Sequence, residues 1–203
     1  MGMAGGSAQA MSYGFENITG NGVPNVADQL SVSVTDAGNG QVSFQFSNEG
    51  AYDATITEVY FDDGTLLGIA SIVNGTGVSF DTGGNNGVNP GNLPGGEDLI
   101  PAFEARDIFS TEASGNNGTG MDTGETLEII FDLLGTKSYA DTLAALEDGS
   151  LRIGLHVRSI GPEGISDSFV NVSTSPVPDA ASSIILMGLA LLGIEGVRRR
   201  FRH

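Results

Sequence analysis

The chain lacks cysteine and tryptophan altogether, and it has few basic residues. Without cysteine there can be no disulfides, no thiolate zinc site and no cysteine nucleophile. A domain of this kind must be stabilised by its hydrophobic core. With 203 residues, the chain is long enough for one such domain with appendages at its ends.

Basic residues are scarce wherever a folded body is expected. Of eight basic and 25 acidic residues, only four arginines, Asp179 and Glu195 lie beyond residue 178, which leaves four bases and 23 acids before it. That part therefore has a net charge of −19. Such a surface repels phosphate backbones, which excludes nucleic acid as the expected partner and suits a soluble protein outside the cell.

Glycine is abundant, with 31 residues grouped with Asn, Asp and Ser in clusters typical of turns. Between the clusters, apolar and polar residues alternate. Leu30, Val32 and Val34 precede the turn DAGNG, and Phe44 and Phe46 follow it, which predicts a β-hairpin with one apolar face. The segment 54–72 repeats this plan, with one strand before and one after the turn DDG.

The rest of the body fits the same class. Residues 81–96 and 114–125 are predicted to be long loops, and 97–110 is ambiguous. Strands are expected over 125–134, 151–160 and 166–173, and one amphipathic helix over 138–150, ended by Gly149. Eight or nine short strands without a βαβ rhythm predict an all-β antiparallel β-sandwich, jelly-roll-like or Ig-like, with one short helix.

The sequence shows no G-x-S-x-G, H-E-x-x-H, P-loop or Rossmann motif. His156 lies in the strand 151–160 on the same face as Arg152 and Arg158, so it is expected to face solvent or a loop and to be structural. Composition alone leaves a Ser-His-Asp triad open, but no spacing supports one. We therefore expect no enzymatic activity, with an unrecognised hydrolase as the remaining catalytic alternative.

Carboxylates in glycine-rich turns raise the question of calcium, which prefers oxygen ligands. The candidates are Asp62, Asp63, Asp122 and Glu125. No EF-hand loop or nonapeptide repeat is present, and Asp and Gly are also what tight turns require. We favour the turn interpretation and expect no cofactor, with calcium as the alternative.

The two ends differ from the body. Residues 1–10 end in Ala8-Gln9-Ala10, which has the small-residue pattern of a signal-peptidase site, so they are interpreted as the remnant of a signal peptide or as a disordered leader. Residues 180–197 carry one charge, Glu195, and as a helix they would be about 27 Å long, enough to cross a bilayer core. A buried helix of the globular core is the alternative.

The order of features at the C-terminus resembles the PEP-CTERM sorting signal. A short motif with V-P-D in place of P-E-P comes first, an apolar segment follows, and a basic cluster stands last. The motif positions are Val177, Pro178 and Asp179. The membrane segment includes Ile184, Leu186, Leu189, Leu191, Leu192 and Val197, and the basic stop consists of Arg198, Arg199, Arg200 and Arg202.

The resemblance implies a three-part chain. Residues 1–10 would be the leader, 11–173 a secreted β-sandwich domain, and 174–203 a sorting signal with a separate C-terminal hydrophobic helix at about 180–197. An exosortase would recognise the tail in the inner membrane of a Gram-negative bacterium and cleave it, which places the mature protein at the cell surface or in the extracellular matrix.

The expected role of the body is structural or adhesive, in association with exopolysaccharide in a biofilm. A carbohydrate-binding module is the alternative, although the lack of tryptophan and the four tyrosines offer little for stacking on sugar rings.

Overall fold

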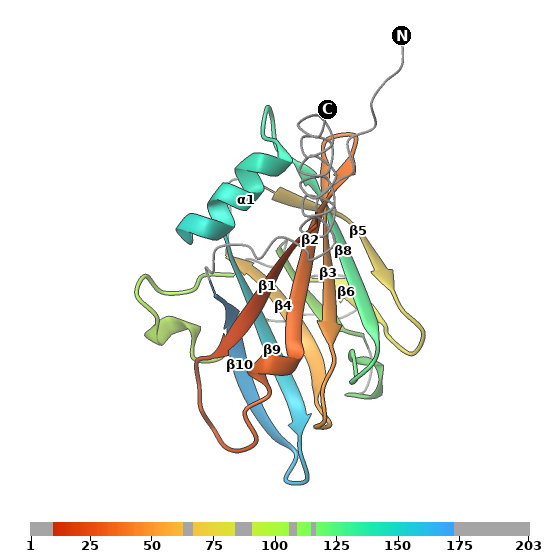
Figure 1. Cartoon of the computed structure of the whole chain (residues 1–203), viewed down its shortest axis with the longest axis vertical. Coiled ribbons are helices and arrows are strands. Elements are labelled where there is room, and N and C mark those ends of the chain that lie inside the picture. Colours follow the sequence, from red (N-terminus) through yellow and green to blue (C-terminus); the bar gives the residue numbers. More distant parts are fainter. Residues whose placement is uncertain (1–9, 63–66, 84–90, 106–108, 115–116, 173–203) are drawn as a thin grey trace, which may run out of the picture.

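The computed structural model describes residues 10–62, 67–83, 91–105, 109–114 and 117–172. The predicted C-terminal helix, the sorting motif and the basic stop all lie outside these residues, as does Asp63. Ten strands and one α-helix form the described domain (Figure 1). In chain order these are β1 (Met11–Asn17), β2 (Leu30–Gly38), β3 (Gln41–Asn48), β4 (Thr55–Asp62), β5 (Leu67–Asn74), β6 (Phe80–Thr82), β7 (Ser110–Ala113), β8 (Thr126–Leu133), α1 (Tyr139–Asp148), β9 (Arg152–Ile160) and β10 (Ile165–Asn171).

All strand pairs are antiparallel, and the strands follow the order β5-β8-β3-β2-β1-β10-β9-β4-β7-β6 in one sheet. β1 connects its two halves, because Met11–Gly14 pair with β2 and Phe15–Asn17 pair with β10. The sheet bends over itself at this strand and is nearly closed into a barrel. The all-β class with one short helix is confirmed.

The predicted antiparallel β-sandwich is found only in part, because β1 continues from one half into the other and the strands form one nearly closed sheet. The β2–β3 hairpin is confirmed, with Asn39 and Gly40 at positive φ in its turn. The second predicted hairpin is not. β4 pairs with β9 and β7, whereas β5 pairs with β8 in the other half of the sheet. Local alternation identifies strands, but it does not identify their partners.

The core fills the space between the two halves. Phe61 from β4 meets Phe44 and Phe131 from the opposite half edge to face, at centroid distances of 5.1 and 4.6 Å. These aromatic contacts add to the area buried on closure. The alternation of apolar residues in β2, β3 and β8 directs their side chains into this space, where they are fully buried.

α1 lies across one end of the strands (Figure 1). Ser138 and Asp141 form a capping box at its start, and Gly149 ends it in the left-handed conformation that glycine favours. Leu146 is buried in the core, and the Tyr139 hydroxyl donates to the carbonyl of Val34 at 3.0 Å. The predicted helix and its end are confirmed. Among the described residues, no helix is both long and apolar enough to cross a membrane.

Candidate functional site

Residues 91–105 form a loop, called the covering loop below, that lies on the outer face of β10, β9 and β4. Leu93 and Phe103 from this loop pack on Tyr60 and Val170, and together they form a second hydrophobic cluster outside the main core. Gly154 on β9 permits the close approach, since a Cβ there would lie 2.8 Å from a methyl group of Leu93 and 3.0 Å from Phe103. Leu93 lies in the segment 81–96, which was predicted to be a long loop, and its side chain is fully buried.

Arg152 holds this loop in place. Its guanidinium donates to the carbonyls of Pro101 and Ala102 at 2.7 and 2.6 Å, pairs with Asp62, and lies over the Phe103 ring at 5.2 Å. A planar guanidinium suits such a set, because several N–H groups can be directed at once. The candidate calcium ligand Asp62 is thus engaged by a cation of the chain itself.

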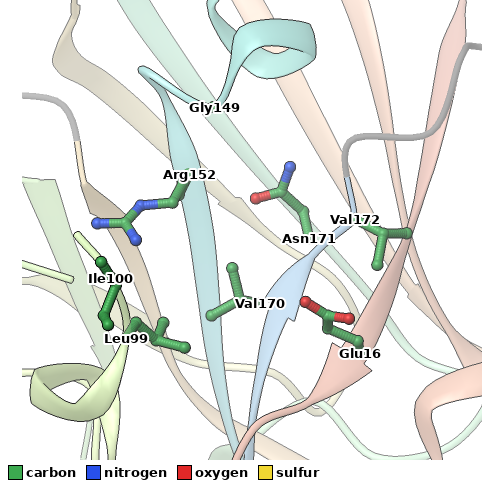
Figure 2. Close-up of a pocket in the computed structure, with 8 residues that line it drawn as sticks. All are labelled: Glu16, Leu99, Ile100, Gly149, Arg152, Val170, Asn171 and Val172. Atoms are coloured by element: carbon green, nitrogen blue, oxygen red, sulfur yellow. The ribbon is translucent and has the colours of Figure 1, made fainter. Parts of the chain in front are cut away.

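A groove of about 470 Å³ lies between this loop and the β1–β10 pair (Figure 2). Figure 2 shows Glu16 and Arg152 on either side of Val170, with Leu99 and Ile100 forming the wall on the loop side. Ile100 is 99% exposed, which is unusual for a large apolar side chain. The groove thus combines an apolar floor and wall with one available carboxylate.

The groove also lies beside the last described residue of the chain. Val172, the last described residue, lines it, and its amide donates to the carbonyl of Gly14 at 3.1 Å. Asn171 lines it as well, with its side-chain oxygen accepting a bond from the amide of Ile153 at 2.6 Å. None of the described lining residues is aromatic, so these residues offer no platform for stacking on a sugar ring.

A buried charge cluster occupies the same outer face. The Glu58 carboxylate accepts bonds from the Tyr60 hydroxyl at 2.7 Å and from Nδ1 of His156 at 2.6 Å, and it lies 3.4 Å from Arg158. His156 shares a face with Arg152 and Arg158 as predicted. Its side chain is only 12% exposed, so it faces Glu58 rather than solvent.

The cluster fixes the protonation states of Glu58 and Tyr60. Burial acts to raise the pKa of Glu58, but the hydrogen bonds from His156 and Tyr60 and the nearby positive charges outweigh it and hold that pKa below its ordinary value. Burial, followed by the charge and hydrogen bond of Glu58, raises the pKa of Tyr60. At neutral pH Glu58 is therefore ionised and Tyr60 protonated, which suits a structural network.

The register brings a serine beside the same histidine. Ser168 on β10 stands opposite His156, and His156 stands opposite Glu58, so a Ser-His-Glu order runs across three strands. Among the described residues, the Ser168 hydroxyl has no hydrogen-bond partner. Ser168 is only 1% exposed, however, so a substrate in solvent does not reach its hydroxyl. The sequence alone does not predict this Ser-His-Glu arrangement, because it depends on pairing between strands that are far apart in the chain.

The two other calcium candidates among the described residues are also engaged within the chain. Asp122 accepts a bond from the Thr55 hydroxyl, and Glu125 accepts one from the amide of Asp122 at 2.9 Å. Asp122 also lines a smaller hollow of about 200 Å³ with Asp53 and Ser159. Within the described ranges, no three His, Asp or Glu side chains come together as a metal site.

Comparison with known proteins yields one match. Residues 176–201 match the family described as the VPDSG-CTERM motif. No curated protein and no solved structure matches the chain. The matched range contains Val177, Pro178 and Asp179, whereas Ala180 and Ala181 stand where the motif's name has Ser and Gly. The motif implies an exported protein that is sorted by an exosortase-type system. The chain thus joins a β-rich domain to a C-terminal VPDSG-CTERM motif, a sorting signal of the PEP-CTERM type.

Proposed function

We propose that this protein is a structural or adhesive component of the bacterial surface or extracellular matrix, associated with exopolysaccharide, and that an exosortase removes its tail near Val177-Pro178-Asp179. The observation that carries the proposal is the match of residues 176–201 to the VPDSG-CTERM motif. The apolar segment and the arginine cluster behind the motif would hold the chain in the inner membrane, with its acidic body outside, until it is cleaved.

The described domain supports a role without catalysis. Glu58 is held ionised by its neighbours, Tyr60 is held protonated, and Ser168 is buried. These are the side chains that a hydrolase on this face would need to expose and to titrate. The chain itself is accordingly proposed to be a substrate of its sorting enzyme and not an enzyme.

The test is to follow the C-terminus by mass spectrometry in cells with and without the exosortase. Wild-type protein is expected to lose the RRRFRH end only where the enzyme is present. Pro178→Ala is expected to retain the tail and to stay in the membrane fraction. Pro162→Ala, in the exposed turn between β9 and β10, is the matched control and is expected to be processed normally. An intact end in both strains would overturn the proposal.

Glycan binding is a second candidate, which the size of the groove and its carboxylate support, although none of its described lining residues is aromatic. A hollow of about 470 Å³ is within the usual size range of ligand sites, and Glu16 offers a carboxylate to sugar hydroxyls. A pull-down with the producing strain's own polysaccharide tests this function. Retention that Glu16→Gln abolishes, and that Glu163→Gln leaves unchanged, would establish it. Equal retention of both variants and wild type would exclude the groove.

A further inference from the structure

The two edges of the sheet differ in length and charge. β6 forms one edge with only three residues, one of which is Asp81. β5 forms the other with eight residues, LGIASIVN, and it contains neither a charged residue nor a proline. Natural proteins usually shorten or charge their edge strands, because a long uncharged edge is a template for pairing with another chain. Only the β6 edge follows this rule.

β5 is open along most of its length. At one end, the Asn74 side chain bonds to the backbone of Phe80 and ties β5 to β6. Between Leu67 and Val73, no described residue outside β8 forms a backbone hydrogen bond with the strand. The amide of Gly75 donates to the carbonyl of Thr126, so strand alternation turns the backbone groups of Ile72 away from β8.

The order of side chains in β5 is self-complementary. In an antiparallel pair of two β5 strands centred between Ala70 and Ser71, Ile69 stands opposite Ile72 of the second copy, and Gly68 stands opposite Val73. Ile69 and Ile72 are partly buried against the core, whereas Ala70, Ser71 and Val73 are exposed. The core-facing side of one copy thus continues into the core-facing side of the other, as register matching requires.

A register shift between Ile69 and Ser71 marks a bulge at Ala70. A bulge interrupts a regular ladder, which disfavours registers that place it opposite regular backbone. The centred register places the two bulges together at a two-fold axis. On either side of the bulges, core-facing residues of one copy then stand opposite core-facing residues of the other. The isologous contact of a two-fold pair has this self-complementary form.

Charge also favours this strand as the meeting point. The chain carries a net charge of −17, so two copies repel each other over most of their surfaces. An uncharged strand is where contact costs least, and added salt screens the remaining repulsion.

We propose that β5 is a self-association edge, and that it pairs with β5 of a second copy of this chain to give one continuous sheet across a two-fold axis. In Figure 1, β5 ends at the right-hand side of the molecule. The inference deepens the proposed structural role by naming the partner, and it rests on that role for its meaning.

The absence of cysteine permits a sharp test with single cysteines in the full chain, purified in detergent. In the centred register the two residues 71 are about 6 Å apart between Cα atoms, and the two residues 73 about 17 Å, from the strand rise and spacing. A disulfide needs about 4.4–6.8 Å. Ser71→Cys is therefore expected to form a disulfide-linked dimer at least about tenfold faster than Val73→Cys.

Ser33→Cys, on the outer face of β2, measures the rate of disulfide formation that random collision alone produces. Equal dimerisation rates for the three variants, or a faster rate for Val73→Cys, would overturn the proposed pairing. All variants keep the same tail, so any association through the tail is common to them. Thermal unfolding checks that each variant is folded.

A second measurement uses charge in place of a cross-link. Ser71→Glu places two carboxylates beside the axis and is expected to weaken self-association about tenfold in sedimentation, with partial recovery in high salt. Ser33→Glu makes the same change in net charge and is expected to behave as wild type. If the two variants behave alike, β5 is not the edge that pairs. The assay reads association of purified protein, so its failure would leave sorting by the exosortase unaffected.

Discussion

The Asn74 side chain forms two hydrogen bonds with the backbone of Phe80. Its amide nitrogen donates to the carbonyl of Phe80 at 3.1 Å, and its oxygen accepts from the amide of Phe80 at 2.8 Å. Asn74 ends β5 and Phe80 begins β6, so one side chain takes the place of a ladder pair where the two edges of the sheet meet.

Asn74→Ala removes both bonds and leaves two partly buried backbone groups of Phe80 without these partners. We expect the free energy of unfolding in urea to fall by about 1–3 kcal/mol. Val73→Thr, an exposed change one residue earlier, is expected to stay within about 0.5 kcal/mol of wild type. Equal stability of Asn74→Ala and wild type would show that the two hydrogen bonds between Asn74 and Phe80 add nothing to the free energy of unfolding.

Gly154 controls how closely the covering loop approaches β9. Gly154→Ala would press on Leu93 and Phe103, and we expect it to lower the free energy of unfolding by about 1–3 kcal/mol and to expose the loop to proteolysis. Gly68→Ala is the control, because nothing lies within 4 Å of the added Cβ on β5. Removing the strand's flexible glycine there is expected to be neutral or stabilising by about 0.5 kcal/mol.

Arg152 and Arg158 lie on the same strand and make very different contacts. Arg152→Ala removes the bonds to two carbonyls and to Asp62, and we expect a loss of about 2 kcal/mol in thermal or urea unfolding. Arg158→Ala loses one contact of 3.4 Å from a side chain that is 39% exposed, so its cost is expected to stay below about 1 kcal/mol. Arg152→Lys is not expected to restore stability, because a single ammonium does not match the fork of the guanidinium.

Glu58 makes acid stability depend on the buried cluster. Its pKa in the folded protein lies below its ordinary value of 4.5, so its contribution is complete above pH 4.5 and is lost as the pH falls through the folded-state pKa. Urea unfolding at a series of pH values is expected to show a smaller loss below pH 4.5 for Glu58→Gln than for wild type. Glu163→Gln, at an exposed turn, is expected to keep the wild-type slope, and a parallel curve for Glu58→Gln would refute this account.

Local patterns predicted local structure well. The β2–β3 hairpin follows from alternation and a glycine turn, and α1 follows from its amphipathic pattern and Gly149. The pairing of β4 with β9 joins residues about a hundred positions apart, for which alternation carries no information. The contact of Glu58 with His156 could not be predicted for the same reason.

The packing of the covering loop was not predicted, for another reason. The sequence predicted a loop over 81–96 and left 97–110 ambiguous, whereas Leu93 and Phe103 from these two segments are fully buried. The available signal was on β9, where Gly154 interrupts the strand and leaves space for an outside group. The sorting motif was the most predictable feature, since a linear signal can be identified without knowledge of the fold.

The bond between Val172 and Gly14 sets a limit on the sorting step. It fixes the last described residue to β1, and Val177 follows only five residues later. An extended chain covers about 3.4 Å per residue, so the motif is tethered within about 17 Å of the folded domain. Under the proposed function, an exosortase that binds Val177-Pro178-Asp179 would therefore have to accommodate the negatively charged β-rich domain within this distance of its recognition pocket.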